Sequence, residues 1–172
     1  MYKIAGVLCI LAGCIGWGSG KIVQDRERIR HLRILFQILG QMRGEISYGK
    51  HTLPEICLIL AELNDGCYKT HFRRIYERTQ MERAAAFPEV WEEEMKACLE
   101  DLPLREDEKS TVEELPKTLN FRDGSGQAGR IGQAESFLEG RYRQAEEACG
   151  NRSKMIRSVS ILTGLLLAIL LL

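Results

Sequence analysis

The sequence lacks the signals that usually point to catalysis or to nucleic-acid binding. Its 24 Lys and Arg residues are balanced by 24 Asp and Glu residues, so nucleic acid is not an expected partner. It contains no Walker A lysine motif, no HExxH motif and no Ser/His/Asp set in a supporting context. We therefore expect no enzymatic activity, no cofactor and no small-molecule substrate.

Strand patterns are also lacking. No segment shows alternating β-branched residues bounded by turns, whereas helical periodicity fills the middle of the chain. The clearest apolar stripe steps by three and four residues through Leu32, Leu35, Leu39, Met42 and Ile46. We predict an all-α fold, a helical bundle of five or six helices flanked by N- and C-terminal transmembrane helices. The first and last helices should pair antiparallel.

Cap and turn residues divide the middle into helices. The first helix should end near 47–49, and Thr52 is the expected N-cap of the second, with Pro54 in its first turn and Glu55 as its capping-box partner. The run 64–66 should end that second helix. Later helices are predicted at 68–83, 89–101, 106–119 with Pro116 as a late kink or stop, and 127–151 after a loop at 120–126. The inward stripe of the last helix includes either Phe137 or Leu138.

The two ends are the only long apolar runs in the sequence, and they indicate membrane anchors. The runs are Ile4 to Gly20 and Ser158 to Leu172, and Lys and Arg residues lie just inside both. Basic flanks stay on the cytoplasmic side of a membrane, so the middle should be cytoplasmic. We predict an anchor at 1–21, a cytoplasmic bundle at 22–154 and an anchor at 155–172. The second run is short, and an alternative is a hydrophobic helix buried in a protein partner.

The string Leu11-Ala12-Gly13-Cys14 supports a competing interpretation. It matches the lipobox that bacterial lipoproteins place before a lipidated cysteine, here Cys14. Against this, the apolar run continues past Cys14, and the arginine cluster that follows it resists export. A lipid anchor at Cys14 would move the domain outside the cell.

Charge is segregated along the middle of the chain. Residues 21–50 carry a net charge of +4, residues 51–115 of −8 and residues 116–172 of +3. Basic ends suit anionic headgroups. The acidic runs Glu92–Glu94 and Glu106–Glu108 are interpreted as solvated faces, because adjacent helical positions point apart and cannot form an acid/base pair.

Two further motifs carry little chemistry. Residues 124–129 spell GxGxxG, but no strand or βαβ unit surrounds them, so we interpret them as a flexible loop before the last helix. None of the six cysteines is in a CxxC pair, and in a cytoplasmic domain such cysteines behave as small buried hydrophobes. Cys67 and His71 have the i,i+4 spacing of two metal ligands, but two ligands do not make a site.

Several segments together resemble the stage III sporulation protein AB family. They are Arg26–Leu32, Glu45–Gly49, Leu53–Glu55, Leu119–Asp123 with Gln127, Lys154–Ser158 and the leucine-rich end from Gly164. The resemblance runs the full length of the chain in order. Asn120 replaces an expected glycine, and Lys50-His51-Thr52 replaces a tighter turn, so the two loops differ in detail.

The resemblance implies a non-enzymatic role. Such a protein has a helical domain similar to the platform proteins of type II secretion and type IV pilus machines, and is part of the mother cell-to-forespore channel. Its membrane would be the mother-cell membrane around the forespore. Its partners would be the secretion-type ATPase of the same operon and other channel proteins, with a homo-oligomer left open. A membrane-anchored adaptor unrelated to sporulation is the alternative.

Two regions are candidate partner contacts. One is the acidic half at 89–115, expected to project furthest from the membrane. The other is the corner between the first two helices, with the loop before the last helix added from the resemblance. The candidate residues are Glu45, Tyr48, Gly49, Leu53, Pro54, Glu55, Glu93, Glu94, Glu106, Glu108, Asp123 and Gln127.

Overall fold

The computed structural model describes residues 2–48, 51–81, 86–119 and 124–171, and within these ranges every regular element is a helix. Side chains of residues 1–22, 118, 124–125 and most positions after 151 lie outside this description. The elements are α1 (Tyr2–Tyr48), α2 (Leu53–Leu63), α3 (Gly66–Met81), α4 (Phe87–Leu99), α5 (Glu106–Glu113), the 3₁₀ turn η1 (Leu115–Thr118) and α6 (Gly124–Leu171). The all-α prediction is confirmed.

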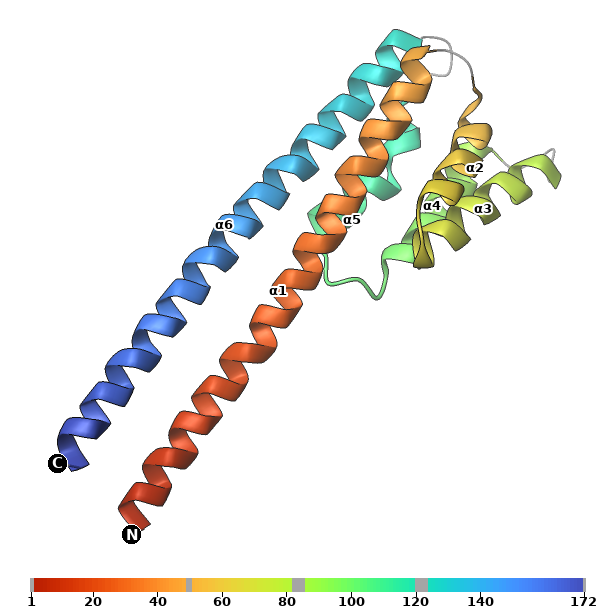
Figure 1. The fold of residues 1–172 in the computed structure, drawn as a ribbon. Coiled ribbons are helices and arrows are strands. Elements are labelled where there is room, and N and C mark those ends of the chain that lie inside the picture. Colours follow the sequence, from red (N-terminus) through yellow and green to blue (C-terminus); the bar gives the residue numbers. More distant parts are fainter. Residues whose placement is uncertain (1, 49–50, 82–85, 120–123, 172) are drawn as a thin grey trace.

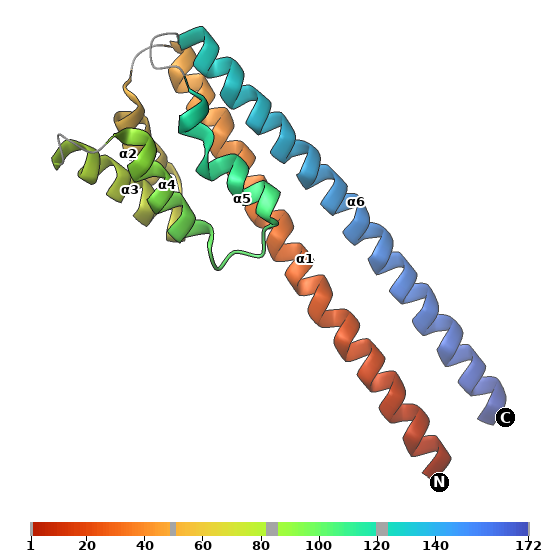
Figure 2. The ribbon, with the colours of Figure 1, turned by 180° about the vertical axis from the view of Figure 1, so that it is seen from behind.

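Two long helices, α1 and α6, form the axis of the molecule. They lie side by side and antiparallel, so the N- and C-termini are at the same end (Figures 1 and 2). The Arg43 side chain packs beside Gly132 and forms an ion pair with Glu135. The rings of Phe36 and Tyr142 lie 5.5 Å apart. The predicted pairing of the first and last helices is confirmed.

The remaining helices form a side bundle against the half of α1 that is far from the termini. Figure 2 shows α5 next to the α1–α6 pair, while α2 packs on α1 and α3 and α4 lie further out. The Trp91 side chain is fully buried, and its ring lies 5.8 Å from that of Phe72 on α3. Its indole N–H donates a 2.8 Å hydrogen bond to the carbonyl of Val112. Trp91 therefore connects α3, α4 and α5 in one core.

The predicted apolar stripe of α1 is this core's central surface. Leu32, Leu35, Leu39, Met42 and Ile46 are all buried. Each buried side chain of this size contributes roughly 1.5–3 kcal/mol relative to exposure. On α6 the open choice between neighbours is settled, because Leu138 is fully buried and Phe137 remains 37% exposed.

The predicted caps and stops are mostly confirmed. The Thr52 backbone N–H donates a 2.7 Å hydrogen bond to the Glu55 carboxylate, the N3 half of the predicted capping box. Residues 64–65 separate α2 from α3, and Gly66 begins α3 with φ +65°, which glycine adopts without strain. Pro116 lies in η1, so α5 stops earlier than predicted. The predicted loop at 124–126 is wrong, because the glycine-rich run already belongs to α6.

The predicted anchors at 1–21 and 155–172 fall largely on positions whose side chains are outside the description. Across the residues that were described, no helix contains a stretch long and apolar enough to cross a bilayer. The flanking transmembrane helices are therefore unsupported by the structure, and they stay predictions.

Candidate partner interface

One group of candidate residues gathers at the end of the helix pair opposite the termini. The end of α1, the start of α2 and the start of α6 meet there (Figure 1). We call this surface the distal corner and define it by the residues Glu45, Tyr48, Leu53, Pro54, Glu55 and Gln127. Gln127 is far from the other five residues in sequence, and the antiparallel pairing of α1 with α6 brings it to the same end of the molecule. Gly49 and Asp123 lie outside the described residues.

The exposed aromatic of the distal corner is Tyr48. Its side chain is 77% exposed at the last position of α1. Leu53 and Pro54 are half-buried at the first two positions of α2, and Gln127 is buried in the first turns of α6. Tyrosine offers a large contact area together with a hydroxyl group, which is why it is enriched at protein interfaces. The predicted contact role of this corner is untested by the geometry and stays a prediction.

Side-chain hydrogen bonds link described residues in the distal corner, one of them across positions 49–50. The His51 ring Nδ1 lies 2.9 Å from Glu45 Oε2. The Glu55 carboxylate accepts hydrogen bonds from the backbone N–H and the hydroxyl of Thr52, at 2.7 and 2.9 Å. These bonds, the backbone one first, hold the pKa of Glu55 below its usual range. In the described part of the distal corner, α2 therefore begins with an ionised carboxylate that caps its first turn.

The acidic runs do not form the solvated faces that the sequence predicted. Glu93 and Glu106 are exposed, but Glu94 is only 8% exposed and Glu108 is fully buried. Three consecutive helical residues cover about 200° of the helix surface, so the members of each run point in different directions and one of them can turn inward. In both runs that member is the third. Burial is tolerated because both carboxylates are paired.

The pairing partners of the buried carboxylates come from other helices. Glu94 lies 2.8 Å from Nδ1 of His71 and accepts a 3.1 Å hydrogen bond from Arg78, both on α3. Glu108 accepts hydrogen bonds from Arg28 on α1, one of them from Nε at 3.1 Å. These two carboxylates stabilise the packing of the helices. A partner could contact them only by breaking their ion pairs.

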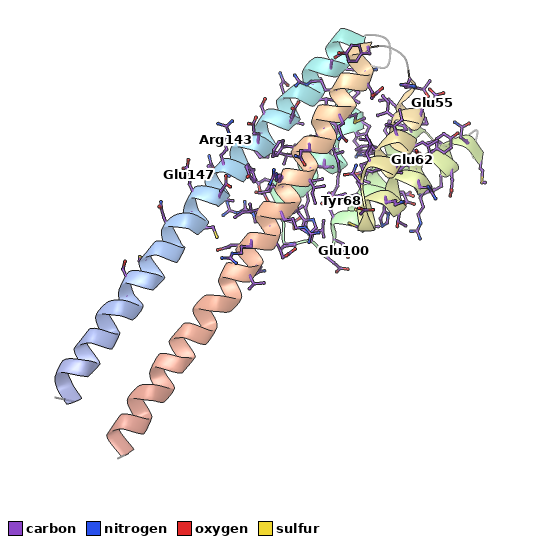
Figure 3. All side chains as sticks on the ribbon, in the orientation of Figure 1. Glu55, Glu62, Tyr68, Glu100, Arg143 and Glu147 are labelled. Atoms are coloured by element: carbon purple, nitrogen blue, oxygen red, sulfur yellow. The ribbon has the colours of Figure 1, made fainter. Side chains whose placement is uncertain are left out.

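The acidic segment also does not project furthest from the termini. Glu108 pairs with Arg28, which is 20 residues, or about 30 Å, along α1 from Tyr48 toward the N-terminus. Figure 3 shows Glu55 near the distal end of the side bundle and Glu100 at the opposite end. The expectation is wrong because an ion pair attaches the acidic segment to Arg28 in the middle of α1. The most distant described surface is the distal corner.

Sequence reasoning missed the groups that join the segments. Arg28 to Glu108, Arg141 to Asp107 and the indole of Trp91 all form bonds across more than 20 residues. One local signal was available. The spacing of Arg105 and Glu108 matches an N-cap and its N3 acceptor, and the Arg105 backbone N–H donates to Glu108 at 2.9 Å. Arginine is not a usual cap residue, so the signal was weak.

The i,i+4 pair Cys67 and His71 forms no metal centre in the described part of the chain. Within it, no group of three or more His, Cys, Asp or Glu side chains is placed to hold a metal ion. His71 is instead bonded to Glu94, and Cys67 lies beside a cavity between α1 and the α2–α3 turn.

The fold defines the class as an all-α protein in which a long antiparallel helix pair carries a side bundle. A family model described as Stage III sporulation protein AB matches residues 3–172. The Stage III sporulation protein AB of Bacillus subtilis (strain 168) is 30% identical over 171 residues, which are 99% of each chain. A solved structure of Stage III sporulation protein AB matches with a TM-score of 0.64 at 25% identity, covering 72% of this chain and 97% of that one.

The chain belongs to the stage III sporulation protein AB family. The resemblance found in the sequence is confirmed, and the family is one of sporulation proteins.

Proposed function

We propose that this protein is a non-enzymatic platform at the mother-cell membrane around the forespore. In this proposal the N-terminal end of α1 and the C-terminal end of α6 anchor the protein in the membrane. The bundle lies in the cytoplasm, and the distal corner binds a secretion-type ATPase. Further channel proteins, or further copies of this chain, would complete the complex.

A single geometric relationship carries the proposal. The two apolar ends of the sequence lie at one end of the helix pair, and the distal corner lies at the other (Figure 1). A protein held by its termini would therefore present the distal corner furthest from the bilayer. The exposed Tyr48 at this position supports a docking role, because a few aromatic side chains usually supply most of an interface's binding energy.

Substitution at the distal corner tests the partner. Full-length chain is purified in mild detergent, and its capture of the ATPase is measured as a binding curve. Tyr48→Ala should weaken binding by roughly tenfold or more, the usual effect of an interface hot spot. Met81→Ala is the matched control, because Met81 is 82% exposed at the end of α3. Equal affinity of Tyr48→Ala and the wild type would remove the distal corner as the docking surface.

Topology is tested separately. Ser136 is exposed on α6, so Ser136→Cys in a variant without the six native cysteines reports where the bundle lies. A membrane-impermeant thiol reagent should label this variant only after the cells are permeabilised. Labelling of intact cells would place the bundle outside, favour a lipid anchor at Cys14 and exclude direct binding to a cytoplasmic ATPase. If labelling places the bundle in the cytoplasm and Tyr48→Ala binds the ATPase as well as the wild type does, the predicted anchors are retained. Only the docking role of the distal corner is then rejected.

A further inference from the structure

The antiparallel packing of α3 against α4 places two cysteines opposite one another. Across this interface the rings of Phe72 and Trp91 are 5.8 Å apart, and His71 Nδ1 lies 2.8 Å from Glu94 Oε2. Positions four apart lie on one face of a helix, one turn apart. One turn before His71 is Cys67, and one turn after Glu94 is Cys98. The register therefore brings Cys67 level with Cys98.

The environment of Cys98 agrees with this register. Both cysteines are free, and the Cys67 side chain is among the groups that act on the Cys98 thiol. Burial, followed by the neighbouring Cys67 side chain, raises the pKa of Cys98. A disulfide needs Cβ atoms about 3.5–4.5 Å apart, so it forms only where two cysteines face each other closely across the helix interface.

The two thiols differ in access. Cys67 is half-buried at the second position of α3 and lines a cavity of about 330 Å³ together with Arg30, His31 and Leu63. Cys98, on α4, is only 4% exposed and belongs to the buried core. A small reagent can reach Cys67 through the cavity, whereas Cys98 is shielded by the core.

We propose that Cys67 and Cys98 form a redox-active dithiol that low-molecular-weight disulfides oxidise to an intramolecular disulfide. The Cys67 thiolate first attacks the reagent disulfide, forms a mixed disulfide and releases one reagent thiolate, which takes up the proton lost by Cys67. The Cys98 sulfur then attacks the Cys67 sulfur, and its proton leaves with the second reagent thiol. One reagent disulfide is reduced to two thiols, and two protein thiols are oxidised to one disulfide.

The consequence is a covalent link between the first turn of α3 and the last turn of α4. These turns lie at the open end of the α3–α4 hairpin, so the bond closes it. The remaining cysteines of the bundle are not placed for this chemistry. Cys57 is fully buried on α2 with a pKa raised by burial, and Cys149 lies on α6.

The test uses the purified full-length chain and oxidised glutathione. After exposure, free thiols are blocked, the chain is digested without reduction, and disulfide-linked peptides are identified by mass. We expect a peptide pair joining Cys67 to Cys98, with the loss of two hydrogens, that disappears after reduction. Cys149→Ser is the matched control and should keep this pair.

Variants of the pair separate the two steps. In Cys98→Ala, confirmed as folded by circular dichroism, glutathione should accumulate on Cys67, because the second sulfur is missing. In Cys67→Ser, neither the linked pair nor glutathione on Cys98 should form. The proposal is overturned if wild-type Cys67 retains glutathione without linking to Cys98, or if neither cysteine reacts in the folded chain.

Discussion

Arg28 and Glu108 lie 80 residues apart in sequence and form an ion pair in which the carboxylate is fully buried. Glu108 also accepts the backbone N–H of Arg105, which starts α5. One side chain thus fixes the beginning of a short helix and attaches that helix to α1. The pair joins the basic start of the bundle to its acidic segment, two regions that look electrically separate in sequence.

Replacing Glu108 with Gln should destabilise the bundle by about 2–4 kcal/mol, because Arg28 loses its countercharge in a mostly buried position. The free energy of unfolding can be measured with urea. Glu106→Gln is the control, because Glu106 is exposed in the same turn and should change stability by less than about 0.5 kcal/mol. Equal effects of the two substitutions would show that the buried ion pair contributes nothing.

His31 should make the bundle less stable as the pH falls below neutrality. Burial lowers its pKa, only partly offset by Glu27, and its Nδ1 shares a 3.0 Å hydrogen bond with Tyr68. In the unfolded chain the pKa of His31 is near 6.5. Below that pH the unfolded state takes up a proton that the folded state resists, so stability falls until the lower folded pKa is passed.

The measurement for His31 is the free energy of unfolding at about pH 7.5 and about pH 5.5, a window that spans the unfolded pKa. Wild-type protein should lose more stability across this window than His31→Gln does. Parallel pH profiles would mean that the folded state protonates His31 as readily as the unfolded state.

Glu55 should contribute a pH dependence of the same sign, but at lower pH. Its lowered pKa means that its stabilising effect is present above the unfolded pKa near 4.5 and is lost as the pH falls through the folded pKa. Glu55→Gln should therefore flatten the acid side of the stability profile. Glu62→Gln, an exposed change on the same helix, should leave that acid limb as steep as in the wild type.

Two glycines of α1 should respond differently to alanine. A Cβ at Gly44 meets nothing within 4 Å, so Gly44→Ala should stabilise the helix by about 0.5–1 kcal/mol. A Cβ at Gly40 would lie 3.0 Å from Oε1 of Glu135, the partner of Arg43. Gly40→Ala should gain less, or lose stability, because Glu135 must shift. Thermal unfolding of both variants tests this, and equal gains would mean that α1 and α6 are not packed closely there.

Local rules predicted the helices well and the buried charges poorly. The stripe from Leu32 to Ile46 and the cap at Thr52 follow from periodicity and from hydrogen bonding within a few residues, so sequence alone identifies them. Glu93 and Glu94 have the same chemistry, and both accept a hydrogen bond from Arg78, but only Glu94 is buried and bonded to His71. That difference depends on the position of His71, which is set by tertiary packing. The distal corner was partly predictable, because Tyr48 and Glu55 flank one turn, but the nearness of Gln127 required the pairing of α1 with α6.

The pairing of α1 with α6 also has a mechanical meaning. A helix of 47 residues is about 70 Å long, and a second helix beside it stiffens it against bending. A tilt of about 10° at the end that holds the termini would sweep the opposite end through about 12 Å. A small reorientation of the end that holds the termini would therefore produce a large displacement of the distal corner.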